Sequence, residues 1–90
     1  MVQQSATSET RDFSAEDGSP WVALAVESTV AHGKLGAILA FRPAAGDEDA
    51  LLRSTITFNS MAAANFALRS LGERELRRRL GLARMAAGGV

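Results

Sequence analysis

The chain has 90 residues, no cysteine, and ten basic and ten acidic side chains, so its formal net charge is zero. This length allows one domain with a thin margin of stability, because a domain of this size buries only about 60–65% of its unfolded surface. The lack of cysteine excludes disulfides and fits a reducing compartment, and the longest apolar runs, 21–26 and 35–41, fall short of the roughly 20 residues that a membrane-spanning helix needs.

Two strands and a turn are predicted to follow a polar N-terminal segment. Residues 1–10 are polar without periodicity and are expected to form a flexible tail without a secretion signal. A short strand is predicted over 11–15, and Asp17-Gly18 is a strong turn signal. Pro20 has no backbone N–H to donate, so it marks the start of the next strand, which is predicted to cover 21–31.

Two further strands are each bounded by turn residues. His32-Gly33 predicts a tight hairpin that leads into a strand over 35–42, which Pro43 ends. Residues 43–49 combine proline, glycine and three consecutive acids, so they are expected to form an exposed acidic loop. A fourth strand is predicted over 51–59.

A two-residue loop at His32-Gly33 would set the register of the middle hairpin, placing Leu24 opposite Phe41 and Val26 opposite Leu39. Because side chains alternate between the faces of a strand, this register predicts one large apolar core face. That face would hold Leu24, Val26, Ser28, Val30, Leu35, Ala37, Leu39 and Phe41, joined by Leu52, Ile56 and Phe58. The reverse face would hold small and mixed residues and remain free for a partner.

The hydrophobic period changes after Asn59 to that of a helix. Asn59 or Ser60 is a suitable N-cap for a helix that begins at Met61. Residues 70–73, Ser-Leu-Gly-Glu, have the form of a capping box, which predicts a kink or split near 70–72 and a second helical segment to about Met85. The apolar stripe of this second segment would be Leu76, Leu80 and Ala83.

Together these elements predict a single α+β domain over 11–86, with tails at 1–10 and 87–90. Its fold would be a four-stranded antiparallel sheet followed by a C-terminal helix, kinked or split near 70–72 and packed on one face.

The zero net charge hides a dipolar layout. Residues 1–50 hold three basic and eight acidic side chains, a net charge of −5, and residues 51–90 hold seven arginines and two glutamates, a net charge of +5. The arginines proposed to bind a partner lie on the second helical segment and are Arg74, Arg77, Arg78 and Arg84. They suit an acidic protein surface or anionic lipid headgroups, and nucleic acid less well, because exposed aromatics for base stacking are lacking. The alternative is a solvated helix face balanced by Glu73 and Glu75.

The sequence contains no pattern of catalytic or metal-ligating residues. His32 is the only histidine, and a metal site needs several converging ligands, so it is interpreted as a turn residue. Asp47, Glu48 and Asp49 are consecutive acids in an exposed loop, whereas acid–base catalysis needs carboxylates in separate environments. We therefore expect no enzyme activity, no catalytic, cofactor-binding or metal-binding residue, no cofactor and no small-molecule substrate.

Trp21 is the remaining candidate for a binding residue. In the predicted register its side chain points away from the core, beside Ala23 and Ala25, where a tryptophan would serve as an interface anchor. The alternative is that the N-terminal tail covers it.

Three short motifs carry a resemblance to known proteins. They are Arg11-x-Phe13-x-x-x-Asp17-Gly18-x-x-Trp21, then Phe41-x-Pro43, and finally Leu71-x-Glu73-x-Glu75-Leu76-Arg77-x-x-Leu80. In these the chain resembles a group of small uncharacterised bacterial domains over most of residues 11–82, with Gly72 in place of that group's polar capping residue. The resemblance implies the fold and no activity. The chain is also faintly similar to soluble accessory subunits of bacterial photosynthetic reaction-centre complexes.

These observations predict a non-catalytic accessory or scaffold subunit that binds neighbouring proteins of a larger assembly, including one at a membrane such as a reaction-centre complex. Its expected location is the cytoplasm, or the cytoplasmic face of the inner membrane as a peripheral protein. The alternative is a small regulator that binds nucleic acid through the arginine-rich helix.

Overall fold

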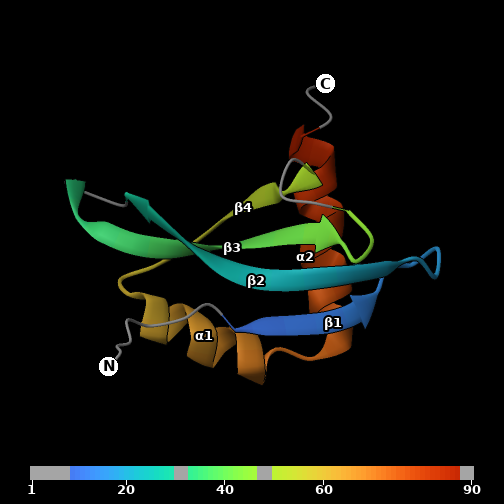
Figure 1. Ribbon diagram of the computed structural model, residues 1–90, viewed down its shortest axis with the longest axis horizontal. Helices are drawn as coiled ribbons and strands as arrows, with labels where there is room; N and C mark the ends of the chain where they lie inside the picture. The colour runs from blue at the N-terminus through green and yellow to red at the C-terminus, as the bar shows by residue number, and fades with distance from the viewer. Residues whose placement is uncertain (1–8, 30–32, 47–49, 88–90) are drawn as a thin grey trace.

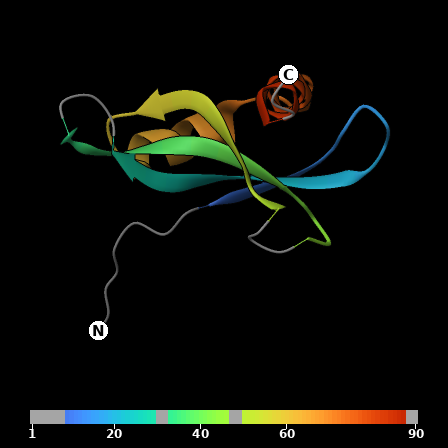
Figure 2. The ribbon, with the colours of Figure 1, turned by 90° about the horizontal axis from the view of Figure 1, so that it is seen from above.

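The computed structural model describes residues 9–29, 33–46 and 50–87. Its elements are β1 (Thr10–Ser14), β2 (Pro20–Thr29), β3 (Leu35–Pro43), β4 (Leu52–Phe58), α1 (Met61–Ser70) and α2 (Glu73–Ala87). The strands form one antiparallel sheet in the order β1-β2-β3-β4. Both helices lie on the same face of it, α1 roughly along the strands and α2 across them (Figures 1 and 2). The predicted α+β fold and the break between two helices are therefore confirmed.

The first hairpin forms at the predicted Asp17-Gly18 turn. Gly18 has a φ of 86°, its N–H donates to the Ala15 carbonyl over 2.9 Å, and the Ala15 N–H donates to the Ser19 carbonyl over 2.8 Å. Such a three-residue loop requires the left-handed backbone that glycine adopts without strain. The Asp17 carboxylate accepts hydrogen bonds from the hydroxyl and the N–H of Ser19, and these bonds lower the pKa of Asp17.

The predicted register of the middle hairpin is wrong by one residue. Ala23 lies opposite Phe41 and Ala25 opposite Leu39, and the last pair joins Thr29 to Leu35. Residues 30–34 therefore connect the strands, not the two-residue loop expected at His32-Gly33; residues 30–32 lie outside the described part of the chain. A shift of one residue moves every side chain of a strand to the other face of the sheet.

The hydrophobic core lies between the sheet and the two helices. It combines Phe13, Trp21, Ala23, Leu39 and Phe41 from the sheet with Leu68, Leu76, Leu80 and Ala83 from the helices. The predicted core positions Ala37, Leu39 and Phe41 of β3, the predicted apolar stripe of α2, and the inward-facing Leu52, Ile56 and Phe58 of β4 are confirmed. Leu35, also predicted for the core, is wrong: it begins β3 beyond the helices and is 66% exposed. The core positions Leu24 and Val26 predicted in β2 are wrong, because Trp21, Ala23 and Ala25 face the helices in their place. Val30, also predicted for the core, lies outside the described residues.

A bulge in β4 adjusts its register to β3. Ile38 pairs with Thr57 and Ala40 with Arg53, so Ser54, Thr55 and Ile56 together oppose Leu39. The Ser54 hydroxyl accepts a hydrogen bond from the Ile56 N–H over 3.1 Å, which satisfies a backbone donor inside the bulge. Bulges at sheet edges discourage pairing with further strands.

The two helices begin differently from one another. Ser60 caps α1, because its hydroxyl accepts from the Ala63 N–H over 3.0 Å, and this settles the choice between Asn59 and Ser60. The capping box predicted at 70–73 is wrong: the Ser70 hydroxyl donates to the Phe66 carbonyl inside α1. Gly72 instead supplies the carbonyl that accepts the first hydrogen bond of α2, from the Leu76 N–H.

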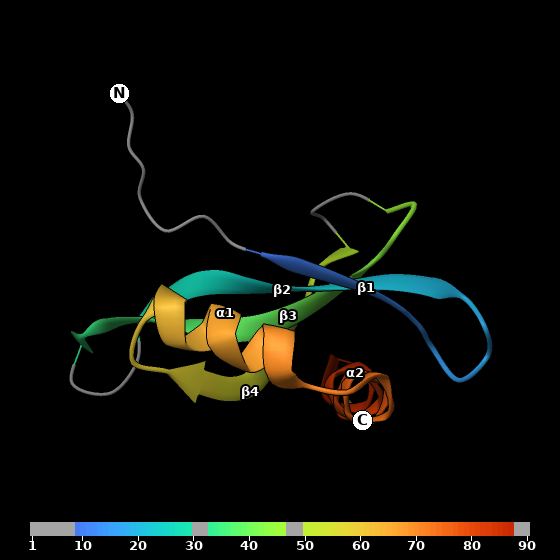
Figure 3. The same ribbon diagram turned by 90° about the horizontal axis from the view of Figure 1, so that it is seen from below.

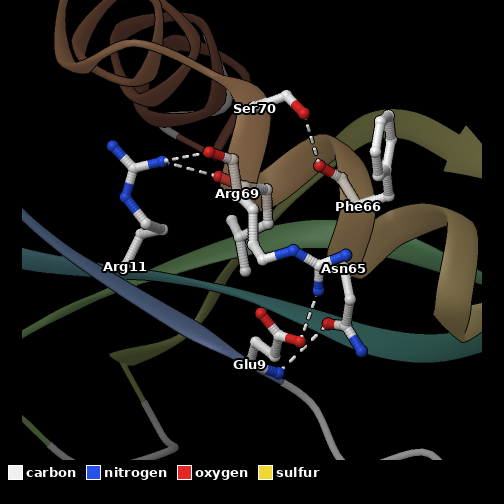
Figure 4. A network of polar contacts seen from close by, with 7 residues as sticks. Glu9, Arg11, Asn65, Phe66, Arg69 and Ser70 are labelled. Atoms are coloured by element: carbon white, nitrogen blue, oxygen red, sulfur yellow. Dashed lines mark hydrogen bonds and ion pairs between the residues drawn. The ribbon is translucent and has the colours of Figure 1, made fainter.

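Polar contacts fasten β1 to the C-terminal end of α1 (Figure 4). The Arg11 guanidinium donates to the carbonyls of Leu68 and Leu71 over 2.7 and 2.8 Å, where a helix leaves its last carbonyls unpaired. Glu9 forms an ion pair with Arg69. A residue assigned to the flexible tail by the sequence is thus held against the helix, and β1 begins at Thr10.

We expect Arg11→Met to lower the free energy of unfolding by about 1–2 kcal/mol, because the helix carbonyls and the helix dipole lose a cation in a partly buried site. The methionine keeps most of the apolar stem, so the loss reports on the guanidinium. Urea denaturation monitored by circular dichroism measures it. Arg74→Met, on a helix surface without a described ion pair, is the control and should change the free energy by less than about 0.5 kcal/mol.

Candidate protein-binding surfaces

The face of the sheet away from the helices, which we call the open face, carries a strip of aliphatic side chains. Its apolar residues are Val22, Leu24, Val26, Ile38 and Ala40. Figure 3 shows both helices on the other side of the sheet, and no described element packs over this strip. Val22, Ile38 and Ala40 are nevertheless buried, so Leu24 and Val26, both half-buried, are the apolar side chains of this face that a partner could contact. A hollow beside them is lined by Arg42, Leu51 and Arg53.

The open face differs from the free surface that the sequence predicted. The predicted free face was small and mixed, but small residues face the helices because they let α1 approach the sheet: Ala25 and Ala37 pack against Ala64. The larger aliphatics of β2 are left on the uncovered side. The alternation of these residues is visible in the sequence, but both faces of β2 are apolar. Which face meets the helices depends on the β2–β3 register, and this register depends on a loop length that could not be predicted from the sequence.

Trp21 does not point away from the core, and this prediction is wrong. It belongs to the core cluster and is only 9% exposed. Its indole N–H donates to the Ser19 hydroxyl over 3.1 Å, and the Arg84 guanidinium lies 5.3 Å from its ring centroid. The physical cause is the register of β2, which turns Trp21 toward α2. Its proposed role as an exposed anchor therefore loses its basis.

The arginines of α2 are largely occupied within the chain. Arg77 pairs with Glu73 over 3.2 Å, and both Arg78 and Arg79 pair with Glu75. Of the four predicted partner-binding arginines, Arg84 covers Trp21, and Arg74 alone lacks an ion pair or aromatic contact among the residues the structure describes. This arrangement resembles the solvated, self-balanced helix face that the sequence offered as an alternative.

The same helix protects the β1 edge of the sheet. The Ser14 N–H donates to the Glu73 carboxylate over 3.1 Å, and Arg77 reaches the Ser14 carbonyl at 3.5 Å. Sequence reasoning missed this contact because the residues lie far apart in the chain. Side chains that occupy the backbone groups of an edge strand prevent another strand from adding there.

A smaller apolar surface lies on the outer side of α2. Leu82 is 51% exposed and Met85 is 71% exposed, and both line a hollow with Arg78 and Gly81 beside the first hairpin. Isolated exposed apolar residues are common on soluble proteins, so this surface by itself is weak evidence for a partner.

The remaining observations concern chemistry and relatives. Among residues 9–29, 33–46 and 50–87, no group of three or more metal-ligating side chains gathers, and neither helix is long and apolar enough to cross a membrane. His32 and the acids Asp47, Glu48 and Asp49 lie outside these ranges. Comparison with protein-family models, curated proteins and solved structures found no match, so the resemblances drawn from the motifs stay predictions.

Proposed function

We propose that this chain is a non-catalytic accessory subunit that binds a neighbouring protein through its open face. The observation that carries the proposal is the strip of Val22, Leu24, Val26, Ile38 and Ala40 on the side of the sheet that the helices leave uncovered. Covering the exposed parts of Leu24 and Val26 would stabilise a complex by roughly 25 cal/mol for each Å² of apolar surface removed from water. A polar rim beside an apolar centre is also the usual composition of a protein interface.

The nucleic-acid alternative receives less support from the geometry. Phosphate binding relies on cations that are free to displace counterions, whereas Arg77, Arg78 and Arg79 already pair with glutamates of the same helix. We also propose that the protein is located at the cytoplasmic surface of a membrane complex, such as a photosynthetic reaction centre.

The proposal predicts that one charge on the open face removes the chain from its assembly. We expect Leu24→Asp to abolish co-elution with the larger complex in size-exclusion chromatography of extract from cells that naturally make the protein, because a carboxylate would be buried without a partner. Leu82→Asp is the matched control: it places the same charge on an exposed leucine of the helix layer and should leave co-elution unchanged.

Both variants should remain folded by circular dichroism, since neither side chain belongs to the core cluster. Retention of Leu24→Asp in the complex would contradict the proposal. Loss of Leu82→Asp alone would move the binding surface to α2.

A further inference from the structure

We propose that the occupant of the open face is a second copy of this chain, stacked face to face about a two-fold axis parallel to the strands. The inference rests on the proposed function, because it names the partner of the same surface. The positions of the charges beside the apolar strip carry it.

These charges share the open face and lie toward opposite edges of the sheet. Asp12 on β1, Val22 on β2 and Arg42 on β3 are neighbours in one row of the ladder and share the open face. In the next row, Arg53 on β4 lies opposite Ala40. The open face is therefore acidic at its β1 edge and basic on its β3–β4 side, with aliphatic side chains between.

A two-fold axis along the strands matches this layout to itself. It places β1 of one copy over β4 of the other and β2 over β3, and it keeps each row at the same height. Each Asp12 therefore lies one row from Arg53 and one strand from Arg42 of the second copy, where the long arginine side chains can reach it. The contact occurs twice, as two-fold symmetry requires, and no like charges of the described residues meet. Two stacked sheets lie about 10 Å apart with their inner side chains interdigitated, which suits a strip of valine, leucine and isoleucine.

Within the described part of the chain, the three charged side chains have no ion-pair partner that would compete with such contacts. Asp12, Arg42 and Arg53 form no ion pair with any other described residue, whereas most arginines of α2 do. With the described residues, Arg42 makes one long hydrogen bond, 3.5 Å, to the Pro43 carbonyl. Complementary charges at the rim of an apolar contact fix the orientation of the partners and suppress wrong ones.

A pair of charge variants tests the symmetry directly. The basic variant carries Asp12→Arg, and the acidic variant carries Arg42→Asp together with Arg53→Asp. Sedimentation equilibrium of the full chain should show a dimer for the wild type and dissociation constants raised about tenfold or more for each variant alone, because like charges then meet twice. An equimolar mixture should restore dimers of near wild-type affinity, since each new charge then faces an opposite one.

Several results would overturn the inference. A wild-type chain that stays monomeric at every soluble concentration would do so, and so would variants that dimerise as well as the wild type or do not recover on mixing. Arg78→Asp, on α2, is the control and should leave the dimer unchanged. If the chain is monomeric but Leu24→Asp is still lost from the native assembly, the second copy is excluded and the proposed function stands with a different partner.

Discussion

Phe41→Ala is expected to lower the free energy of unfolding by about 3–5 kcal/mol, the usual cost of emptying a buried phenylalanine site. Phe41 is completely buried, and its ring packs edge-on against Phe13 with centroids 6.0 Å apart. Phe41 lies on β3 between β2 and β4 and packs against the helices. The cavity left by the alanine therefore cannot close without moving several elements. A domain of this size is stabilised by only about 5–15 kcal/mol in total, so the loss is a large fraction of its stability.

The measurement is urea denaturation followed by the fluorescence of Trp21, which lies in the same core cluster. Phe66→Ala is the matched control, because it deletes the same ring from a position on α1 that is 64% exposed. It should change the free energy of unfolding by about 0.5 kcal/mol or less. Equal losses for the two variants would mean that Phe41 is not in the core.

Local signals in the sequence were sufficient for the order and type of the elements. Gly18 predicted the first turn, Pro20 and Pro43 marked strand boundaries, and Ser60 was among the caps expected for α1. Each of these depends on the backbone preference or hydrogen-bonding capacity of a residue and its near neighbours. Such signals can be interpreted from the sequence because they do not depend on contacts with distant residues.

The binding surface could not be predicted in the same way. Both faces of β2 are apolar, so the hydrophobic pattern alone does not tell which one meets the helices. The choice follows from the β2–β3 register and from α1, which packs closely on the alanines at 25 and 37. The predicted two-residue loop, in place of a five-residue connection, shifted the register by one residue, which was enough to exchange the core and the open face of β2. The contacts of Glu9 and Arg11 with α1 were missed because they join opposite ends of the chain.

Enlarging an alanine of β2 therefore distinguishes the two registers experimentally. Ala25→Leu should lower the free energy of unfolding by about 3 kcal/mol, at the upper end of the range for overpacking, because Ala25 is 1% exposed and sits beneath α1 against Ala37 and Ala64. In the register that the sequence first predicted, the same side chain would lie on the free face, and the substitution would be nearly neutral.

Val26→Leu is the control on the adjacent residue, because it adds one methylene group to a half-buried side chain on the open face and should cost less than about 1 kcal/mol. Both variants are compared with the wild type by urea denaturation at one protein concentration, since self-association through the open face would raise the apparent stability at higher concentrations. A near-neutral Ala25→Leu combined with a costly Val26→Leu would return Val26 to the core and Ala25 to the surface. That outcome would remove the aliphatic strip on which both the protein-binding role and the face-to-face dimer depend.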